Sequence, residues 1–338
     1  MTSAVIATAE TSEPGQGGGP LVGLAFSDLY LEPDSQAWFK RSPDDRERHV
    51  VQGDTLEETL ALRKRLQEHN TGRDFRVDWE SIRLRVQRIE TVDGDVYVCR
   101  RLLDQPIAFA ELGYPPKLMK ALLSDEFTKG GLVLFTGPAG AGKSTSLASW
   151  LAARLATFGG TACTIENPVE VTLHGRHGTG DVVGTCYQTQ VREDAEFGPS
   201  IQRILRAAPN MIFIGEIRGK DAAAQAVLAG TSGHLVTSTL HANNVQAGLE
   251  RLKTMLAESG LDAGFLADAV AAVLYQTMTT TRIGGTQRKR VVVTPLIVAG
   301  AQNETAIRAH LRSGDFSQLV SEIERQRRVM VQSGEGAL

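Results

Sequence analysis

A glycine-rich segment constrains this chain more than any other part of its sequence. An apolar run, Leu132–Phe135, leads into Gly137-Pro138-Ala139-Gly140-Ala141-Gly142-Lys143-Ser144-Thr145, which matches the pattern G-x-x-x-x-G-K-[ST]. Glycines let backbone N–H groups approach phosphate oxygens, and the helix that begins here points its positive end at them. We therefore predict a phosphate-binding loop (P-loop) for ATP. Lys143 would bridge the β- and γ-phosphates, the Ser144 hydroxyl would ligate Mg²⁺, and Thr145 would bond a phosphate further back.

The composition is that of a globular protein, and the length of 338 residues favours two domains. A net charge of −3 does not favour non-specific binding of nucleic acid. Cys99, Cys163 and Cys186 are too scattered for a disulfide framework or a CxxC metal site, so we expect them to be small buried residues.

The first twenty residues read as a polar Ser/Thr/Gly/Pro tail and not as a signal peptide. No stretch reaches the roughly 18 apolar residues of a transmembrane helix, and the longest candidate, 291–301, is interrupted by Thr294 and Pro295. These features predict a cytoplasmic protein, and any association with a membrane would come through a partner.

Composition and periodicity divide the chain into five parts. The predicted parts are a tail (1–20), an N-terminal domain (21–104), a linker (105–117), a P-loop domain (118–300) and a helical C-terminal segment (301–338).

The N-terminal domain shows one helical and two strand-like patterns. We expect a helix over Glu57–Glu68, a half-buried strand containing Ile82, Leu84 and Val86, and a hairpin turn at Asp93-Gly94. This arrangement predicts a small α+β domain.

Strands and helices alternate in the P-loop domain, which predicts a parallel sheet covered by helices. The expected strands cover 131–136, 162–165, 211–214 and 234–239, and the expected helices cover 117–123, 147–155, 265–275 and 305–327, with a hairpin through Gly284-Gly285.

A P-loop alone does not separate kinases, GTPases and motor ATPases, but the N/T-K-x-D guanine motif is missing. Glu166 and Glu170 follow a predicted strand, where ligands of parallel sheets bind. Such a carboxylate can orient the attacking water and accept its proton, although a solvated acidic turn would look similar.

The ends of two further predicted strands distinguish better between these classes of P-loop protein. Met211–Ile214 leads to Gly215-Glu216, which resembles a Walker B strand with glycine in place of the usual Asp. Glu216 would then hold Mg²⁺ through a water. The alternative is a buried strand that ends in a glutamate by chance. His234 and His241 bracket another apolar strand, and a histidine at the sheet edge can sense the γ-phosphate, although a lone histidine is more often structural.

Together these segments resemble the secretion and pilus ATPase superfamily, and within it the type IV pilus retraction (PilT-like) and the DotB- and TraJ-like secretion and conjugation ATPases. The resemblance covers about Ser27 to Arg327. It is carried by Ser27–Leu31 (an S-D-L-H-L strand), Thr164–Glu170 (an "Asp box" with Asn167 replacing Asp), Gly215–Arg218 (Walker B), Gly233–His241 ("His box") and Ala306–Arg312 (the A-I-R-N-L-I-R element of retraction ATPases).

Two features refine the resemblance. Three scattered cysteines do not supply the four-cysteine zinc motif usual in pilus-assembly and type II secretion ATPases, which disfavours that branch. Residues 174–186 are longer and richer in glycine than the loop that usually follows the Asp box.

The resemblance implies an α/β protein in which a RecA-like P-loop ATPase domain carries a smaller PAS-like α+β N-terminal domain. It implies a homo-hexamer that acts on an inner-membrane platform or secretion-machine protein. It also implies that arginines of the N-terminal domain reach the nucleotide: Arg83 and Arg85, which share a strand face, and Arg100 or Arg101, which do not share one. A solvated strand face is the alternative for these arginines.

We therefore expect a hexameric ATP-hydrolysing motor of the retraction type, with a motor of a type IV secretion or conjugation system as the alternative. Glu166 would activate water, Glu216 would hold the Mg²⁺ shell and His241 would read the γ-phosphate. A RecA-type nucleic-acid motor would need a basic groove bearing aromatic side chains, for which 6% aromatic residues offer no sign. A nucleotide-bound scaffold without turnover is disfavoured by the intact Lys143, Glu166 and Glu216.

Overall fold

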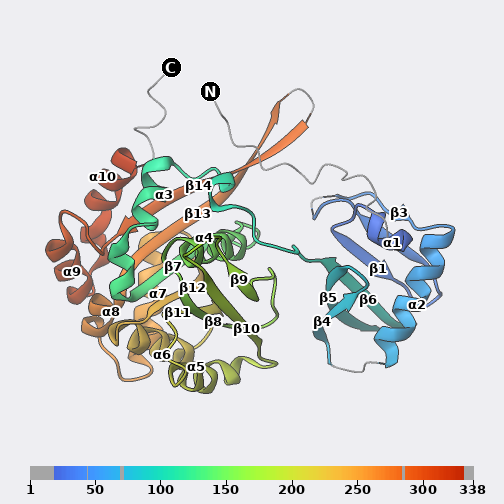
Figure 1. Cartoon of the computed structure of the whole chain (residues 1–338), viewed down its shortest axis with the longest axis horizontal. Coiled ribbons are helices and arrows are strands. Elements are labelled where there is room, and N and C mark those ends of the chain that lie inside the picture. Colours follow the sequence, from blue (N-terminus) through green and yellow to red (C-terminus); the bar gives the residue numbers. More distant parts are fainter. Residues whose placement is uncertain (1–18, 44, 69–71, 284–285, 331–338) are drawn as a thin grey trace. The chain divides into compact units, whose positions relative to one another are not determined.

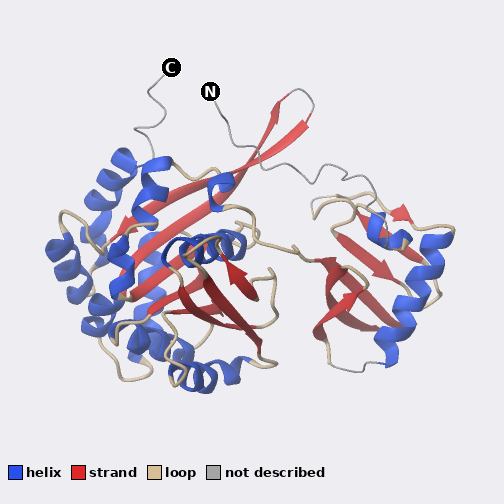
Figure 2. Cartoon of the chain, in the orientation of Figure 1, coloured by secondary structure: helices blue, strands red, loops and turns tan. Residues whose placement is uncertain are grey.

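The computed structural model describes residues 19–43, 45–68, 72–283 and 286–330. By their internal contacts these residues form two compact units. The N-terminal unit contains the chain up to residue 105 together with 170–172, and the C-terminal unit contains the rest. Each unit has its own sheet and its own hydrophobic core (Figures 1 and 2).

The N-terminal unit is an antiparallel sheet in the order β3-β2-β1-β6-β5-β4. Its elements are α1 (Pro20–Gly23), β1 (Asp28–Leu31), β2 (Ala37–Lys40), β3 (His49–Val50), α2 (Asp54–Glu68), β4 (Asp74–Trp79), β5 (Ile82–Thr91) and β6 (Gly94–Arg101). The expected helix, strand and hairpin are confirmed. Leu62 and Leu66 of α2 pack with Leu84 and Val86 of β5 in one core, so α2 covers the apolar face of the sheet.

The C-terminal unit is built on a mixed sheet in the order β14-β13-β7-β12-β11-β8-β10-β9. Its strands are β7 (Gly131–Gly137), β8 (Gly160–Glu166), β9 (Gly175–His177), β10 (Gly184–Gln190), β11 (Met211–Glu216), β12 (Leu235–His241), β13 (Val270–Ile283) and β14 (Thr286–Ile297). The strands from β13 to β10 are parallel to their neighbours, and only the edge strands β14 and β9 run antiparallel. The expected parallel sheet is therefore confirmed for its central part.

Helices cover both faces of this sheet. They are α3 (Pro116–Leu122), α4 (Lys143–Phe158), α5 (Phe197–Leu205), α6 (Lys220–Thr231), α7 (Val245–Ala257), α8 (Ala263–Ala269), α9 (Glu304–Ser313) and α10 (Val320–Met330), with short 3-10 helices at Phe109–Leu112, Asp125–Lys129, Asp194–Glu196 and Phe316–Leu319. Leu132 and Leu134 of β7 join the core formed with α5 to α10, whereas Phe135 packs against Trp150 of α4. Because strand side chains alternate, α4 lies on the face opposite α5–α10.

Two predicted helices differ from the structure. The helix expected over 265–275 ends at Ala269, and Val270 starts β13. The run from Val270 to Leu274 is buried between two neighbouring strands, and a continuous apolar run of this kind fits a buried helix as well as a buried strand. The helical region expected over 305–327 is split, because Gly314 adopts φ 73° and ends α9.

The structure also bears on the predicted tail, the second hairpin, the cysteines and the absence of a transmembrane helix. Residues 1–18 of the predicted tail and the two glycines of the predicted hairpin lie outside the described residues; the flanking strands β13 and β14 pair antiparallel up to Ile283 and Thr286. Cys99, Cys163 and Cys186 are all buried, as expected. Among the described ranges, no helix is long and apolar enough to span a membrane.

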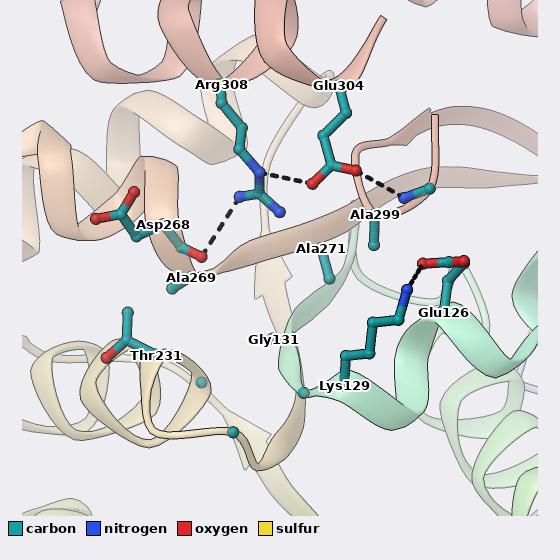
Figure 3. Close-up of a pocket in the computed structure, with 14 residues that line it drawn as sticks. Glu126, Lys129, Gly131, Thr231, Asp268, Ala269, Ala271, Ala299, Glu304 and Arg308 are labelled. Carbon is teal, nitrogen blue, oxygen red and sulfur yellow. Dashed lines mark hydrogen bonds and ion pairs between the residues drawn. The ribbon is translucent and has the colours of Figure 1, made fainter. Parts of the chain in front are cut away.

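Arg308 of α9 ties the C-terminal helices to the sheet (Figure 3). Its guanidinium donates to the carbonyls of Ala267, Asp268 and Val270 at 2.5, 3.4 and 3.4 Å, and to Glu304 at 2.8 Å. The last carbonyls of a helix have no partner within that helix, so Arg308 satisfies the end of α8 just where β13 begins.

We predict that Arg308→Met lowers the free energy of unfolding by about 1–3 kcal/mol, because it removes a charged donor from several carbonyls. Arg312→Met is the matched control: Arg312 pairs with Asp268, and both side chains are more than half exposed. That substitution should cost at most about 1 kcal/mol. Chemical denaturation of both variants measures the difference, and equal losses would contradict the role of Arg308.

Candidate functional site

The P-loop connects the end of β7 to the start of α4, as the sequence predicts. Gly137, Gly140 and Gly142 have φ values of 151°, 74° and 76°, a region that side chains rarely tolerate. A Cβ atom on Gly137 would lie 2.2 Å from the carbonyl oxygen of Gln276, so only glycine fits there. The loop and the first residues of α4 thus provide closely spaced backbone N–H groups at a helix N-terminus, which suits a phosphate group.

Lys143 is buried, and its ammonium lies inside the loop. Nζ donates to the carbonyls of Gly137 and Pro138 at 3.1 and 2.8 Å. Nζ also lies 3.5 Å from Nδ1 of His241. These oxygens and the ring nitrogen hold the cation at the position from which it can contact a bound phosphate.

The sheet brings three of the predicted residues to the same edge. His241 ends β12 and pairs in register with Gly137, Glu216 ends β11, and Glu166 ends β8. The strands lie in the order β7-β12-β11-β8, and all four are parallel. The P-loop, His241, Glu216 and Glu166 therefore stand on successive strands at the carboxyl edge of the sheet, where ligands of α/β proteins bind.

Charged and polar contacts continue along this edge. Nε2 of His241 lies 3.4 Å from Glu216, and the other carboxylate oxygen of Glu216 accepts from Nε of Arg218 at 2.9 Å. Arg218 also donates to Asp194 at 3.2 Å. Burial acts to lower the pKa of Arg218, but Glu216 and Asp194 outweigh it and raise that pKa. A continuous chain of contacts thus connects Lys143 to Asp194 through His241, Glu216 and Arg218.

Glu166 is 4% exposed and is held by two donors. Its Oε1 accepts from the Thr164 hydroxyl at 2.7 Å and from Nε2 of Gln188 at 2.9 Å. The amide oxygen of Gln188 in turn accepts from the backbone of Leu173 and His174 at 2.7 and 2.9 Å. Because these backbone donors fix which way the amide faces, Gln188 holds the Glu166 carboxylate in one orientation.

Glu170 has different surroundings, although it lies only four residues after Glu166. It belongs to the N-terminal unit, where its carboxylate accepts from Arg85 at 3.2 Å. The structure therefore gives Glu170 a contact with an arginine, while Glu166 alone occupies the end of β8.

Three of the four predicted arginines share one face of the N-terminal sheet. Arg85 and Arg100 are direct cross-strand partners, and Arg83 lies two residues from Arg85 on the same face. Each has an acidic partner: Arg83 pairs with Asp104, Arg85 with Asp74 and Glu170, and Arg100 with Asp28. Arg101 points to the other face and donates to the carbonyls of Val22 and Leu24.

His234 is not brought to the P-loop. It precedes β12 and accepts a hydrogen bond from Gly131 at the start of β7, at the amino end of these strands. His241 ends the same strand seven residues later, about 20 Å away at the usual rise of a strand. The assignment of His234 to a nucleotide site rests on its sequence pattern alone.

A cavity of about 310 Å³ lies at that opposite end of the sheet (Figure 3). Its lining includes Glu126, Lys129, Asp268, Glu304 and Arg308. These charges are already paired: Lys129 with Glu126, Arg308 with Glu304, and Asp268 with Arg312. Because Gly131 and Gly233 at the amino ends of β7 and β12 line it, the cavity is distinct from the phosphate-binding edge.

Comparison with known proteins identifies the family of this chain. A family model described as "Type II/IV secretion system protein" matches residues 62–331. This chain belongs to that family of secretion ATPases. The predicted superfamily is thereby confirmed.

Solved structures of the family share the fold. The pilus retraction motor PilT with bound ADP matches with a TM-score of 0.70 and 25% identity, covering 90% of this chain and 87% of that one. The Legionella pneumophila ATPase DotB matches with a TM-score of 0.66 and 18% identity, covering 94% and 90%, and shows the fold alone.

Curated relatives include a putative type II secretion system protein E of Escherichia coli, 36% identical over 207 residues, which are 60% of this chain and 40% of that protein. The type IV pilus assembly ATPase TfpB of Acinetobacter baylyi is 31% identical over 268 residues, 74% and 44% respectively. The chain thus spans less than half the length of these relatives. The matches include retraction, assembly and secretion proteins.

The orientation of Glu166 yields a prediction. Gln188→Leu removes the amide donor to Glu166, so in the proposed ATPase reaction we expect the rate of phosphate release to fall by up to about a hundredfold while ATP affinity is retained. Thr164→Val, which removes the other donor, should lower the rate in the same direction.

Gln190→Leu is the matched control on the same strand, because the Gln190 amide contacts only the Val169 backbone among the contacts described, at 3.4 Å. Stopped-flow detection of phosphate compares the variants. If the rate of Gln188→Leu equalled that of Gln190→Leu, Gln188 would have no part in orienting Glu166.

Proposed function

We propose that this chain binds and hydrolyses ATP, releasing ADP and phosphate, and acts as the motor subunit of a type IV pilus or related secretion machine of the retraction type. The observation that carries the proposal is the arrangement at the carboxyl edge of the sheet. The P-loop lysine is connected through His241 to Glu216, and the buried carboxylate of Glu166 stands on the next strand.

The residues of this edge take complementary parts in the reaction. The P-loop amides and Lys143 bind the phosphates, and Lys143 follows the charge that develops on the transferred group. Glu166, held by its two donors, orients the attacking water and accepts its proton. His241 contacts both Lys143 and Glu216, so it registers whether the γ-phosphate is present.

The donor atoms at this edge also fit Mg²⁺. The Ser144 hydroxyl at the start of α4 and the carboxylate of Glu216 are hard oxygen donors of the kind Mg²⁺ prefers. Ser144 would bind the ion directly and Glu216 through a water. The ion would neutralise charge on the phosphates.

The assignment to a machine is supported by two observations. The fold matches a pilus retraction motor over 90% of this chain, and Ala306–Arg312, which resembles the retraction element, forms most of α9. In this proposal a homo-hexamer acts at the cytoplasmic side of an inner-membrane platform or secretion-machine protein, without direct contact with nucleic acid. The C-terminal unit is of the RecA type and the N-terminal unit of the PAS type, and Arg83, Arg85 and Arg100 of its charged face approach the nucleotide.

The test is steady-state phosphate release with Mg·ATP for the wild type and Glu166→Gln, with oligomer mass measured alongside. We expect turnover by a six-fold assembly and a loss of at least about a hundredfold in the variant, with ATP binding retained. Lys143→Ala is the control for binding, because it should weaken ATP affinity as well.

Other outcomes would favour other functions. Stable ATP occupancy without phosphate release, with the machine partner added, would indicate a scaffold. Turnover that rises with single-stranded DNA would indicate a nucleic-acid motor. Unchanged turnover in Glu166→Gln would move the base to Glu170 or Glu216.

Deletion in the native host separates the machines. Loss of a retraction motor should leave pili that extend and do not retract, whereas loss of an assembly motor should abolish pili. Intact pili with impaired protein or DNA export would instead assign the chain to a secretion or conjugation system.

A further inference from the structure

Gln276 is a polar side chain buried completely behind the P-loop. It lies in β13, directly after the last residue pair that joins β13 to β7. Nε2 donates to the carbonyl of Ala141 in the P-loop at 2.5 Å, and Oε1 accepts from the Tyr114 hydroxyl at 2.8 Å. The two side chains thus form a relay from Tyr114 through Gln276 to the loop.

The direction of this relay is fixed. Tyr114 is 3% exposed, and burial raises the pKa of its hydroxyl far above the ordinary value, so it stays protonated and donates. The amide oxygen of Gln276 therefore faces Tyr114, and the NH₂ group faces Ala141. No flip of the amide would preserve both hydrogen bonds.

The bond to Ala141 sets the direction of a loop donor. In a trans peptide the C=O and the following N–H point in opposite directions. Because the Ala141 carbonyl is bound to Gln276, the N–H of Gly142 points away from β13. The Gln276 backbone closes the same side, since its carbonyl faces Gly137 so closely that a Cβ atom would not fit.

Tyr114 itself lies on the segment that leads from the N-terminal unit into α3. This segment carries the 3-10 helix Phe109–Leu112, followed by Gly113 in a left-handed conformation. The ring of Tyr114 packs against that of Phe109, with 5.4 Å between the ring centroids. The relay therefore anchors the P-loop to the stretch of chain that follows residue 105.

We propose that Tyr114 and Gln276 are positioning residues of the phosphate site, which hold the P-loop amides in their binding conformation and connect the loop to the segment that precedes α3. The inference rests on the proposed binding and hydrolysis of ATP. Because Gln276 bonds the Ala141 carbonyl and Tyr114 bonds Gln276, both residues would act through the backbone of Ala141 and Gly142.

Gln276→Met keeps the length of the side chain and removes both hydrogen bonds. We expect the Kd for ADP to rise about tenfold or more, since a loop donor loses its fixed direction and a buried carbonyl loses its partner. Tyr114→Phe should raise Kd in the same direction by less. The double variant should bind ADP as Gln276→Met does, because the two residues act as one unit.

Gln326→Met is the matched control. Gln326 is also buried, and its amide exchanges two hydrogen bonds with the backbone of Ile297 on β14. It should lower the melting temperature about as much as Gln276→Met while leaving the Kd for ADP unchanged.

Titration of the full-length protein with ADP, with melting temperatures for all variants, decides the matter. Equal Kd values for Gln276→Met and Gln326→Met, or additive effects in the double variant, would overturn the relay. If Gln276→Met does not fold, the Kd of Tyr114→Phe for ADP tests the relay in its place. Wild-type protein that binds no ADP would instead refute the proposed function, which separates the two failures.

Discussion

The close approach of β13 to the P-loop is the constraint on which the rest of the site depends. The Gln276 carbonyl leaves no room for a side chain at Gly137, and its amide binds the Ala141 carbonyl. With β13 on one side of β7 and β12 on the other, the loop leaves the sheet between two fixed neighbours. The same parallel order places His241 on the strand next to β7 and Glu216 on the strand after it. The conformation of the loop and the position of the Glu216 carboxylate therefore follow from one packing arrangement.

Much of this site could be predicted because its signals are local in the sequence. The P-loop occupies consecutive residues, and Glu166, Glu216 and His241 each end an apolar run that forms a strand. The rule that ligands bind at the carboxyl ends of parallel strands then brings them together. The order of these residues across the sheet cannot be predicted from such local signals, because it depends on which strands pair. The helix expected over 265–275 was wrong for another reason. A strand that is buried on both faces lacks a two-residue period, so its apolar run resembles that of a buried helix.

The residues that hold the site in place escaped prediction for a related reason. Gln276 is separated from Ala141 by 135 positions, and Gln188 from Glu166 by 22. Each is a single polar residue in or near a strand, with no pattern to mark it. The one available signal is that Gln276 interrupts the apolar run that begins at Val270, and a polar group in such a place needs a buried partner. His234 shows the converse: its pattern matches that of His241, yet it lies at the other end of β12.

The internal contacts of Lys143 have a consequence for exchange of nucleotide. Its ammonium is bonded to the carbonyls of Gly137 and Pro138, so a phosphate bound at the proposed site would have to replace these partners. When a bound phosphate left, the same carbonyls would be placed to accept the ammonium again. In the proposed motor, this exchange of partners would lower the affinity for the product and so favour turnover.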